Sequence, residues 1–359
     1  MKITLSRFSV TKRHALTISR GTSAGSENLL VGVEHEGVIG IGEMAPTSGG
    51  AVAETADTAH ADVLRWRDLL ADVAPWEMQK IDNCLLYSGG HAAHAALDIA
   101  LHDWLGRKAG MPLWRLFGLD LARIPPTSLT IGINPPEALR EVVPEILART
   151  GARALKVKLG NPAGVEADQA SFAAVQEATA KFEAGRDDGA IPILWRVDAN
   201  GGWTPENARA MIAWLAARGV EFVEQPLPRG REKDLPAIHK DSPLPIYADE
   251  SIYLASDIPP LAGCIDGVNL KLMKCGGLRE ALRIIHTARA HGLKVMIGCM
   301  SETSLAITAA AHLSPLADAL DLDSHLNLRD DPFTGAEYIE GRVVPTNRPG
   351  LGVQYIAGR

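Results

Sequence analysis

The chain has 359 residues, of which 46% are hydrophobic and 22% are charged, a composition typical of a folded globular protein. Its formal net charge is −7, from 36 basic and 43 acidic side chains, and the basic residues form no cluster, so nucleic acid and membrane surfaces are not expected partners. No apolar run approaches the roughly 20 residues of a membrane-spanning helix, and the first residues lack the apolar core of a signal peptide. We therefore expect a cytoplasmic protein whose four scattered cysteines stay reduced.

The first third of the chain predicts a small α+β unit. Residues 1–60 alternate polar and apolar side chains between turn signals, as in ITLSRFSV and NLLVGVEHEG, which is typical of an antiparallel sheet. Residues 51–117 are rich in alanine and leucine at helical spacing. Strands and helices in separate runs indicate an α+β arrangement, and we expect this capping domain to span residues 1–122.

Beyond residue 122 short apolar strands alternate with helical stretches. Eight candidate strands are found, at residues 127–133, 153–159, 193–199, 220–225, 244–250, 267–273, 293–298 and 319–324. Their spacing of about 25 residues is one strand plus one helix, so a TIM-type (β/α) barrel is predicted over residues 123–325. The one longer interval contains FEAGRDDGAIP and is expected at the bottom of the barrel. Residues 326–359 return to strand-and-turn patterns and are expected to rejoin the capping domain.

Three carboxylates end three successive barrel strands, and barrel active sites lie at the carboxyl ends of strands. They are Asp198, Glu224 and Asp249, on strands roughly 5 Å apart. Carboxylates this close repel one another unless a cation lies among them. Oxygen ligands without nearby histidine or cysteine favour Mg²⁺ over zinc. The alternative, three unrelated rim carboxylates, leaves their repeat at the barrel period unexplained.

Lysines approach the same site from two sides. Lys156 and Lys158, in LKVKLG, are two residues apart and share the strand face predicted to line the barrel interior. Lys271 ends the sixth strand, opposite the second in a ring of eight. Two opposed bases could remove an α-proton on one face and return it on the other. Burial and the nearby metal ion are expected to lower the lysine pKa values. Lys156 is expected to hold down the pKa of Lys158 by like-charge repulsion and to help bind the substrate carboxylate. The alternative is an ion pair with rim carboxylates, which would explain one lysine but not two on opposite walls. Lys274 is expected to be a solvated or loop residue.

Six motifs in order along the chain resemble the enolase superfamily and, within it, the muconate lactonizing enzyme subgroup. They are KVK (156–158), DANGGW (198–203), EQP (224–226), ADES (248–251), NLKLMKCGG (269–277) and PGLGV (349–353). The resemblance spans nearly the whole chain. It implies a capping domain completed by the C-terminal segment, a (β/α)7β barrel, and Mg²⁺ held by Asp198, Glu224 and Asp249. It also implies Lys158 and Lys271 as the two acid/base catalysts.

The last strand distinguishes among the reactions of this subgroup. Asp321 and Asp323, in ALDLDSHL, share a strand face aimed at the barrel mouth, and two carboxylates there suit the α-ammonium of a peptide. This Asp-x-Asp resembles dipeptide epimerases such as the L-Ala-D/L-Glu epimerases. We expect an isomerase that epimerises a dipeptide at an α-carbon by two-base 1,1-proton transfer through an enediolate. The alternative reaction on the same site is that of an o-succinylbenzoate synthase or of an N-succinyl/N-acyl amino acid racemase. The alternative for the two aspartates is an acidic turn at the barrel rim without a role in function.

These motifs indicate the reaction more clearly than they indicate which dipeptide is the substrate. Three further residues are expected to make supporting polar contacts with the substrate. They are Thr130, at the end of the first strand, and Asn200 and Glu250, beside predicted metal ligands. The resemblance implies a mobile capping-domain loop that reads the substrate side chain, here ISRGTSAGSEN (18–28). Relatives acting on L-Ala-D/L-Glu carry an arginine in this loop that meets the glutamate side chain. This loop contains Arg20, but small neutral residues follow it. A dipeptide other than L-Ala-L-Glu is therefore at least as strongly expected. A homo-oligomer is expected on general grounds. A non-catalytic binding protein is disfavoured, because such a protein has no need of two opposed bases.

Overall fold

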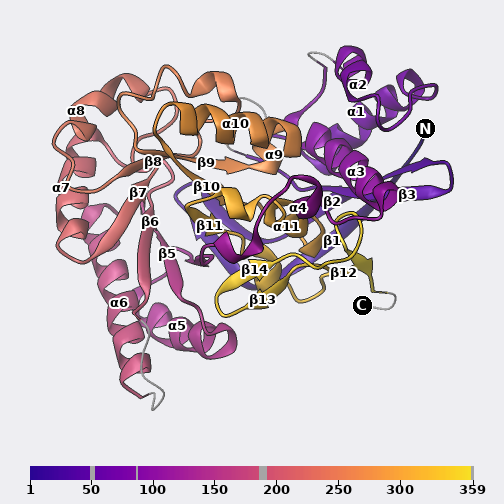
Figure 1. Cartoon of the computed structure of the whole chain (residues 1–359). Coiled ribbons are helices and arrows are strands. Elements are labelled where there is room, and N and C mark those ends of the chain that lie inside the picture. Colours follow the sequence, from indigo (N-terminus) through magenta and orange to yellow (C-terminus); the bar gives the residue numbers. More distant parts are fainter. Residues whose placement is uncertain (49–52, 86–87, 186–191, 357–359) are drawn as a thin grey trace.

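The computed structural model describes residues 1–48, 53–85, 88–185 and 192–356. They form an antiparallel sheet with its own helices and an eight-stranded parallel sheet surrounded by helices (Figure 1). Among the described residues, none of the helices combines the length and the apolar character that a membrane span requires.

The N-terminal unit is a three-stranded antiparallel sheet followed by helices. Its elements are β1 (Lys2–Ile18), β2 (Gly21–His35), β3 (Val38–Met44), α1 (Ala56–Leu69), α2 (Met78–Leu85), α3 (His91–Ala109), α4 (Leu113–Leu116) and η1 (Leu121–Arg123). Helix α3 packs directly on β3, where a Cβ added to Gly42 would lie 2.0 Å from the carbonyl oxygen of Ala96. Glycine in β3 therefore permits this close helix–strand approach. The predicted α+β unit is confirmed.

The second unit is a parallel barrel with its strands in sequential order. The strands are β4 (Leu129–Ile131), β5 (Ala154–Lys158), β6 (Leu194–Asp198), β7 (Val220–Glu224), β8 (Ile246–Ala248), β9 (Gly267–Lys271), β10 (Lys294–Gly298) and β11 (Ala319–Asp321). Neighbours are hydrogen-bonded from β4 through β11, and a bridge between Thr127 and Leu320 joins the two ends. Each strand overlaps one predicted from the sequence, so the TIM-type barrel prediction is confirmed.

Helices connect the strands and cover the outside of the barrel (Figure 1). They are α5 (Pro136–Thr150), α6 (Val165–Ala184), α7 (Pro205–Ala216), α8 (Leu235–His239), α9 (Leu272–Cys275), α10 (Leu278–Ala290) and α11 (Ser304–Ala311), with short turns η2 (Glu232–Asp234), η3 (Ala255–Asp257), η4 (Ser314–Leu316) and η5 (Ser324–Asn327). Leu155, Val157 and Leu159 are fully buried, as expected for the face of β5 opposite its lysines. The predicted insertion between the second and third strands falls mostly on residues 186–191, outside the described residues.

The C-terminal segment forms two short antiparallel pairs. Strands β12 (Phe333–Thr334) and β15 (Gln354–Tyr355) pair with each other, as do β13 (Glu337–Ile339) and β14 (Arg342–Val344). Beyond β14, the Leu351 backbone N–H donates to Asp103 of α3 at 2.8 Å. The segment therefore contacts the N-terminal unit. The domain boundaries expected after residues 122 and 325 stay predictions.

Buried Glu43 joins the two units. Its carboxylate, on β3, accepts hydrogen bonds from Thr303 N (3.0 Å) and Ala306 N (3.1 Å) at the start of α11, and from Asn28 Nδ2 at 2.6 Å. Burial raises the pKa of Glu43 to about 7, and these hydrogen bonds oppose the rise. The contacts hold the N-terminal sheet over the carboxyl ends of the barrel strands.

Residues 18–28, predicted as a mobile loop, are the tip of a β-hairpin. Leu16, Thr17 and Ile18 pair with Ser23, Thr22 and Gly21, so the turn consists of residues 19–20. The tip rests on the barrel, because Ser19 and Arg20 donate to the carbonyl oxygen of Asn200 at 3.1 and 2.9 Å. The segment is a paired hairpin rather than an irregular loop, because the small residues of TSAGSE continue the pairing of β2 with β1. Its mobility stays a prediction.

Candidate active site at the barrel mouth

A cavity of about 540 Å³ lies between the β1–β2 hairpin and the carboxyl ends of the barrel strands. The predicted site residues that line it are Arg20, Thr130, Lys158, Asn200, Asp249, Glu250, Lys271, Asp321 and Asp323. The three others, Lys156, Asp198 and Glu224, are fully buried and linked to these by the ion pairs described below. The fold thus brings all the predicted residues together. Leu16, Ile18 and Met300 add apolar surface to the wall.

Asp198, Glu224 and Asp249 form one buried cluster. One oxygen of each carboxylate lies within 4.8 Å of the others. Burial, with repulsion from Asp198, raises the pKa of Glu224 to about 8. A cluster that offers only carboxylate oxygens suits a hard divalent cation such as Mg²⁺. The residues present therefore fit the ion that the sequence predicted.

Two residues that sequence reasoning missed hold this cluster in place. Gln225, directly after Glu224, has a left-handed backbone (φ 38°), a conformation that costs of order 1–3 kcal/mol and persists where surrounding contacts enforce it. Its Oε1 accepts from Asp249 N at 2.8 Å. Asn269 Nδ2 donates to Glu224 Oε1 at 2.8 Å. Asn269 lies two residues before Lys271, so the period of a strand could have placed it on the same face.

Lys158 and Lys271 flank the carboxylate cluster. Lys158 Nζ lies 2.6 Å from Asp198 Oδ2, and Lys271 Nζ lies 2.8 Å from Asp249 Oδ2. They come from β5 and β9, which are four strands apart in the eight-stranded order. Because the barrel closes on itself, this separation places the two amines on opposite walls.

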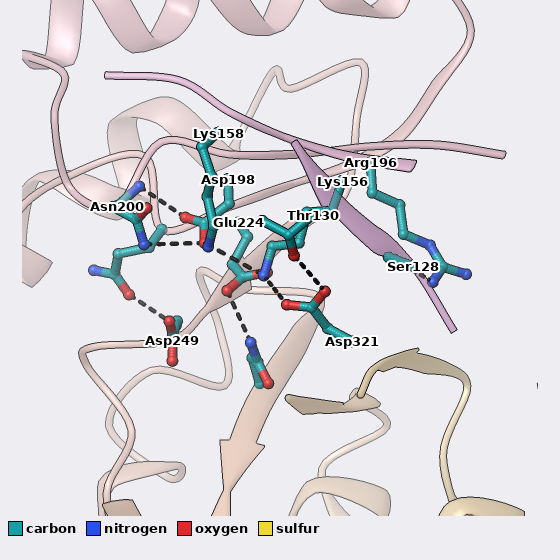
Figure 2. A network of polar contacts seen from close by, with 12 residues as sticks. Ser128, Thr130, Lys156, Lys158, Arg196, Asp198, Asn200, Glu224, Asp249 and Asp321 are labelled. Carbon is teal, nitrogen blue, oxygen red and sulfur yellow. Dashed lines mark hydrogen bonds and ion pairs between the residues drawn. The ribbon is translucent and has the colours of Figure 1, made fainter. Parts of the chain in front are cut away.

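Lys156 lies below the cavity, at the centre of the charge network. Its Nζ is 2.7 Å from both Glu224 Oε2 and Asp321 Oδ2 and 3.3 Å from Asp198 Oδ2 (Figure 2). Burial lowers the pKa of Lys156, but attraction by Asp321 and Glu224 outweighs burial and raises it. The pKa of Lys271 is raised in the same way, with Asp249 as the main attracting charge. Without a cation among the carboxylates, the pKa of each of these lysines is therefore raised, because each ammonium group has carboxylate partners. The lowering expected beside a bound metal ion stays a prediction.

Lys274 is buried rather than solvated. It is 2% exposed and donates to Asp249 Oδ1 at 2.5 Å and to the carbonyl oxygens of Ile252 and Asn269 at 3.0 Å. Helix α9 begins directly after β9, which turns the lysine back beneath the segment that carries Asp249. The prediction of a loop residue was wrong because this one-turn helix left no periodic signal.

The two aspartates of strand eight have different partners. Asp321 ion-pairs with Lys156 and accepts from Thr130 Oγ1 at 3.1 Å (Figure 2). Asp323 accepts from Thr130 N at 2.6 Å through Oδ2, and its Oδ1 lies 4.0 Å from the Cys299 thiol. Burial and the neighbouring Asp321 raise the pKa of Asp323 to about 6. Asp321 is thus ion-paired with a lysine. Asp323 has no ion pair among the described residues and lines the cavity together with Lys12, whose pKa its charge helps to raise against the lowering by burial. Its carboxylate is therefore available to a substrate cation.

Arg20 connects the hairpin tip to the rim of the barrel. Its guanidinium lies 2.7 Å from Glu250 Oε1 and also donates to the Asn200 carbonyl oxygen. The Asn200 side chain donates to Asp198 Oδ2 at 3.0 Å (Figure 2). It also donates to Glu250 Oε1 at 3.3 Å. Asn200 and Glu250 therefore link the hairpin to the carboxylate cluster. The substrate-binding role of Arg20 stays a prediction, since its charge is already paired within the protein.

Two family models match the chain in sequence. "Mandelate racemase / muconate lactonizing enzyme, N-terminal domain" matches residues 2–118, and "Enolase C-terminal domain-like" matches residues 138–357. A hydrophobic dipeptide epimerase of Roseobacter litoralis is 49% identical over 355 residues, covering 98% of each chain. A hydrophobic dipeptide epimerase of a Flavobacteria bacterium (strain MS024-2A) is 46% identical over 355 residues, covering 98% of this chain and 97% of the relative.

A solved structure shows the same architecture. The dipeptide epimerase of Enterococcus faecalis V583, determined in complex with Mg and the dipeptide L-Leu-L-Tyr, superposes with a TM-score of 0.88 at 32% sequence identity and covers 99% of both chains. The similarity therefore extends over the N-terminal unit, the barrel and the C-terminal segment together.

Proposed function

This chain belongs to the mandelate racemase and muconate lactonizing enzyme family of the enolase superfamily, and from this premise we propose that it is a Mg²⁺-dependent dipeptide epimerase. One observation carries the proposal: Lys158 and Lys271 lie on opposite walls of the cavity, each beside the carboxylate cluster. A substrate α-carbon between them has one amine on each face. Such a pair inverts a carbon centre, whereas a binding site gains nothing from it.

The two lysines exchange protons with the substrate α-carbon. One amine, in its neutral form, removes the proton from one face, and the opposite ammonium delivers a proton to the other face. Their roles reverse when the other epimer is the substrate. Asp198, Glu224 and Asp249 would hold the Mg²⁺ ion, which would supply positive charge to the substrate carboxylate. Lys156 orders the carboxylates from below through its ion pairs.

Asp323 orients the dipeptide by its N-terminus. Its carboxylate lines the cavity and is held by Thr130 N, so a substrate ammonium gains a charge-assisted hydrogen bond there. An N-acyl amino acid or an o-succinylbenzoate precursor has no such ammonium. This difference favours a dipeptide over the alternative substrates on the same site.

The cavity favours a dipeptide without an acidic side chain. The charge of Arg20, which could meet an acidic side chain, is already paired with Glu250 at 2.7 Å. Leu16, Ile18 and Met300 supply apolar wall. Both relatives described above are named as epimerases of hydrophobic dipeptides. We therefore assign hydrophobic dipeptides as the substrate class.

We also propose that the enzyme works in the cytoplasm as a homo-oligomer. All four cysteines are free thiols, which suits a reducing compartment. Self-association is the common state of soluble enzymes of this size and is proposed on that general ground.

Incubation of dipeptide pools with enzyme and Mg²⁺ in D₂O, followed by mass spectrometry, tests the function. Hydrophobic dipeptides are expected to gain one deuterium at an α-carbon, because the proton that returns comes from solvent-exchanged lysine. Pools of N-acyl amino acids are expected to remain unlabelled. Labelling of the N-acyl pool with none in the dipeptides would replace the proposal by a racemase of acylated amino acids.

Asp323→Asn is expected to lower kcat/KM for dipeptides by roughly 10- to 150-fold. The estimate follows from the 1.5–3 kcal/mol of a hydrogen bond to a charged group, which the neutral amide largely forfeits. Affinity for Mn²⁺ should not change, because Asp323 is not part of the carboxylate cluster. The matched control is Asp241→Asn, at an exposed position. Unchanged kinetics in Asp323→Asn would show that the substrate ammonium binds elsewhere.

A further inference from the structure

A smaller cavity lies next to the ammonium-binding end of the active site. It measures about 50 Å³ and shares four lining residues with the main cavity: Leu16, Thr130, Asp323 and Asn327. We call it the side cavity. It is bounded by the outward face of β4, helix α5, the β1 segment at residues 14–16 and the turn η5. Because Asp323 belongs to both walls, a group bound at Asp323 stands at the junction of the two cavities.

Hydrocarbon dominates the wall of the side cavity. Its apolar lining residues include Leu129, Ile131, Leu139, Val142, Ile146 and Leu326. At its edge the Glu145 carboxylate lies 2.7 Å from His14 Nε2 and 3.3 Å from Arg149 Nε, and Asp323 is the acidic residue of the wall. Away from Asp323 at the junction, the side cavity therefore offers an apolar group a hydrocarbon surface.

The elements around the side cavity are tied to one another. Asn327 accepts from His14 N at 3.0 Å and donates to His14 O at 2.8 Å, which joins η5 to β1. Arg149 donates to the carbonyl oxygen of Leu326 at 2.9 Å, which joins α5 to η5. The backbone N–H of Ile133 donates to Thr17 O at 2.8 Å. These hydrogen bonds hold the side cavity in its shape before a ligand binds. A bound group therefore does not pay the entropy cost of ordering the residues that line the cavity.

A glycine sets the distance between β1 and the segment after β4. A Cβ added to Gly132 would lie 3.1 Å from Leu16 Cδ1 and equally close to the backbone of Thr17. This contact is tighter than ordinary van der Waals distance, so a larger residue would push Leu16 away from its place in the wall. The absence of a side chain at Gly132 thus keeps both cavities bordered by Leu16.

We propose that the side cavity binds the side chain of the substrate's N-terminal residue and selects branched aliphatic groups there. The inference rests on the proposed function, since the dipeptide ammonium must be held by Asp323. The α-carbon of that residue is one bond from the ammonium, so its side chain starts at the junction of the cavities. A water molecule needs roughly 10–15 Å³, and the side cavity therefore admits a few methyl-sized groups, as in valine or leucine.

The test compares kcat/KM for L-Leu-L-Leu and Gly-L-Leu, which differ only in the N-terminal side chain. The wild-type enzyme should prefer L-Leu-L-Leu by roughly 10-fold or more, the range that apolar pockets give for added methylene groups. Val142→Phe, which fills the side cavity from α5, should remove that preference and leave kcat/KM for Gly-L-Leu within about 2-fold of wild type. Ala148→Leu, on the exposed face of the same helix, should retain the preference.

A second variant keeps the test decisive if Val142→Phe folds poorly. Val142→Ala enlarges the side cavity and should raise kcat/KM for L-Phe-L-Leu relative to L-Leu-L-Leu. The proposal is overturned if a folded Val142→Phe retains the preference for L-Leu-L-Leu over Gly-L-Leu. Where Val142→Phe folds poorly, it is overturned if Val142→Ala leaves the ratio of L-Phe-L-Leu to L-Leu-L-Leu unaltered. A wild-type enzyme that epimerises dipeptides without any N-terminal preference overturns the side-cavity proposal alone. One that epimerises none overturns the proposed function.

Discussion

Lys158→Ala and Lys271→Ala are each expected to abolish epimerisation, lowering kcat by about 10²- to 10⁴-fold, the usual contribution of a general acid or base. Inversion at the α-carbon needs one group on each face. Either variant keeps a base on one wall and loses the proton donor on the other. The measurement is the rate of interconversion of the two epimers, followed by polarimetry or chiral chromatography.

Hydrogen exchange in D₂O separates the roles of the two lysines. Lys158→Ala is expected to exchange the α-proton of only one epimer, through Lys271, and Lys271→Ala to exchange only that of the other epimer. A residue that merely stabilises the fold would slow both exchanges alike. Lys240→Ala, at an exposed position, is the control. Wild-type epimerisation in either lysine variant, or exchange of the same epimer by both, would contradict the two-base assignment.

Glu224→Gln is expected to weaken divalent-cation binding at least 10-fold and to reduce turnover to near background. Even residues that only support metal ligands typically contribute 10- to 100-fold to affinity, and Glu224 belongs to the cluster itself. Manganese titration followed by EPR gives the affinity independently of activity. EDTA should inactivate the wild-type enzyme, and added Mg²⁺ should restore it.

The control for Glu224→Gln is Glu177→Gln, at an exposed position of α6, where a surface ion pair with Arg140 contributes little. Glu177→Gln should bind Mn²⁺ with wild-type affinity. If Glu224→Gln also retains that affinity, or if activity persists in EDTA, the carboxylate cluster is not the metal site.

The location of the site could be predicted from sequence because two simple periodicities determine it. A repeat of about 25 residues indicates strand–helix units, and parallel strands of one barrel all end at the same rim. Position at a strand end was therefore enough to identify Asp198, Glu224, Asp249 and Lys271 as site residues. The two-residue period of a strand then placed Lys156 and Lys158 on the interior face.

Pairing between distant segments was decided by the tertiary structure alone. Lys274 was misread because its partner Asp249 is 25 residues away along the chain, and the pKa directions of Lys156 and Lys271 depend on carboxylates from other strands. The hairpin tip at residues 18–28 likewise depends on strand pairing and on the Asn200 carbonyl.

What the sequence by itself determined about this protein is therefore the barrel, its rim and the chemical groups on it, since these follow from local periodicity. Only the folded structure decided which aspartate of strand eight pairs with a lysine. It also decided which other charges are paired and where a side cavity remains. The physical reason is that electrostatic and packing energies depend on distances between atoms. Those distances are set when segments hundreds of residues apart, such as β1 and η5, come into contact.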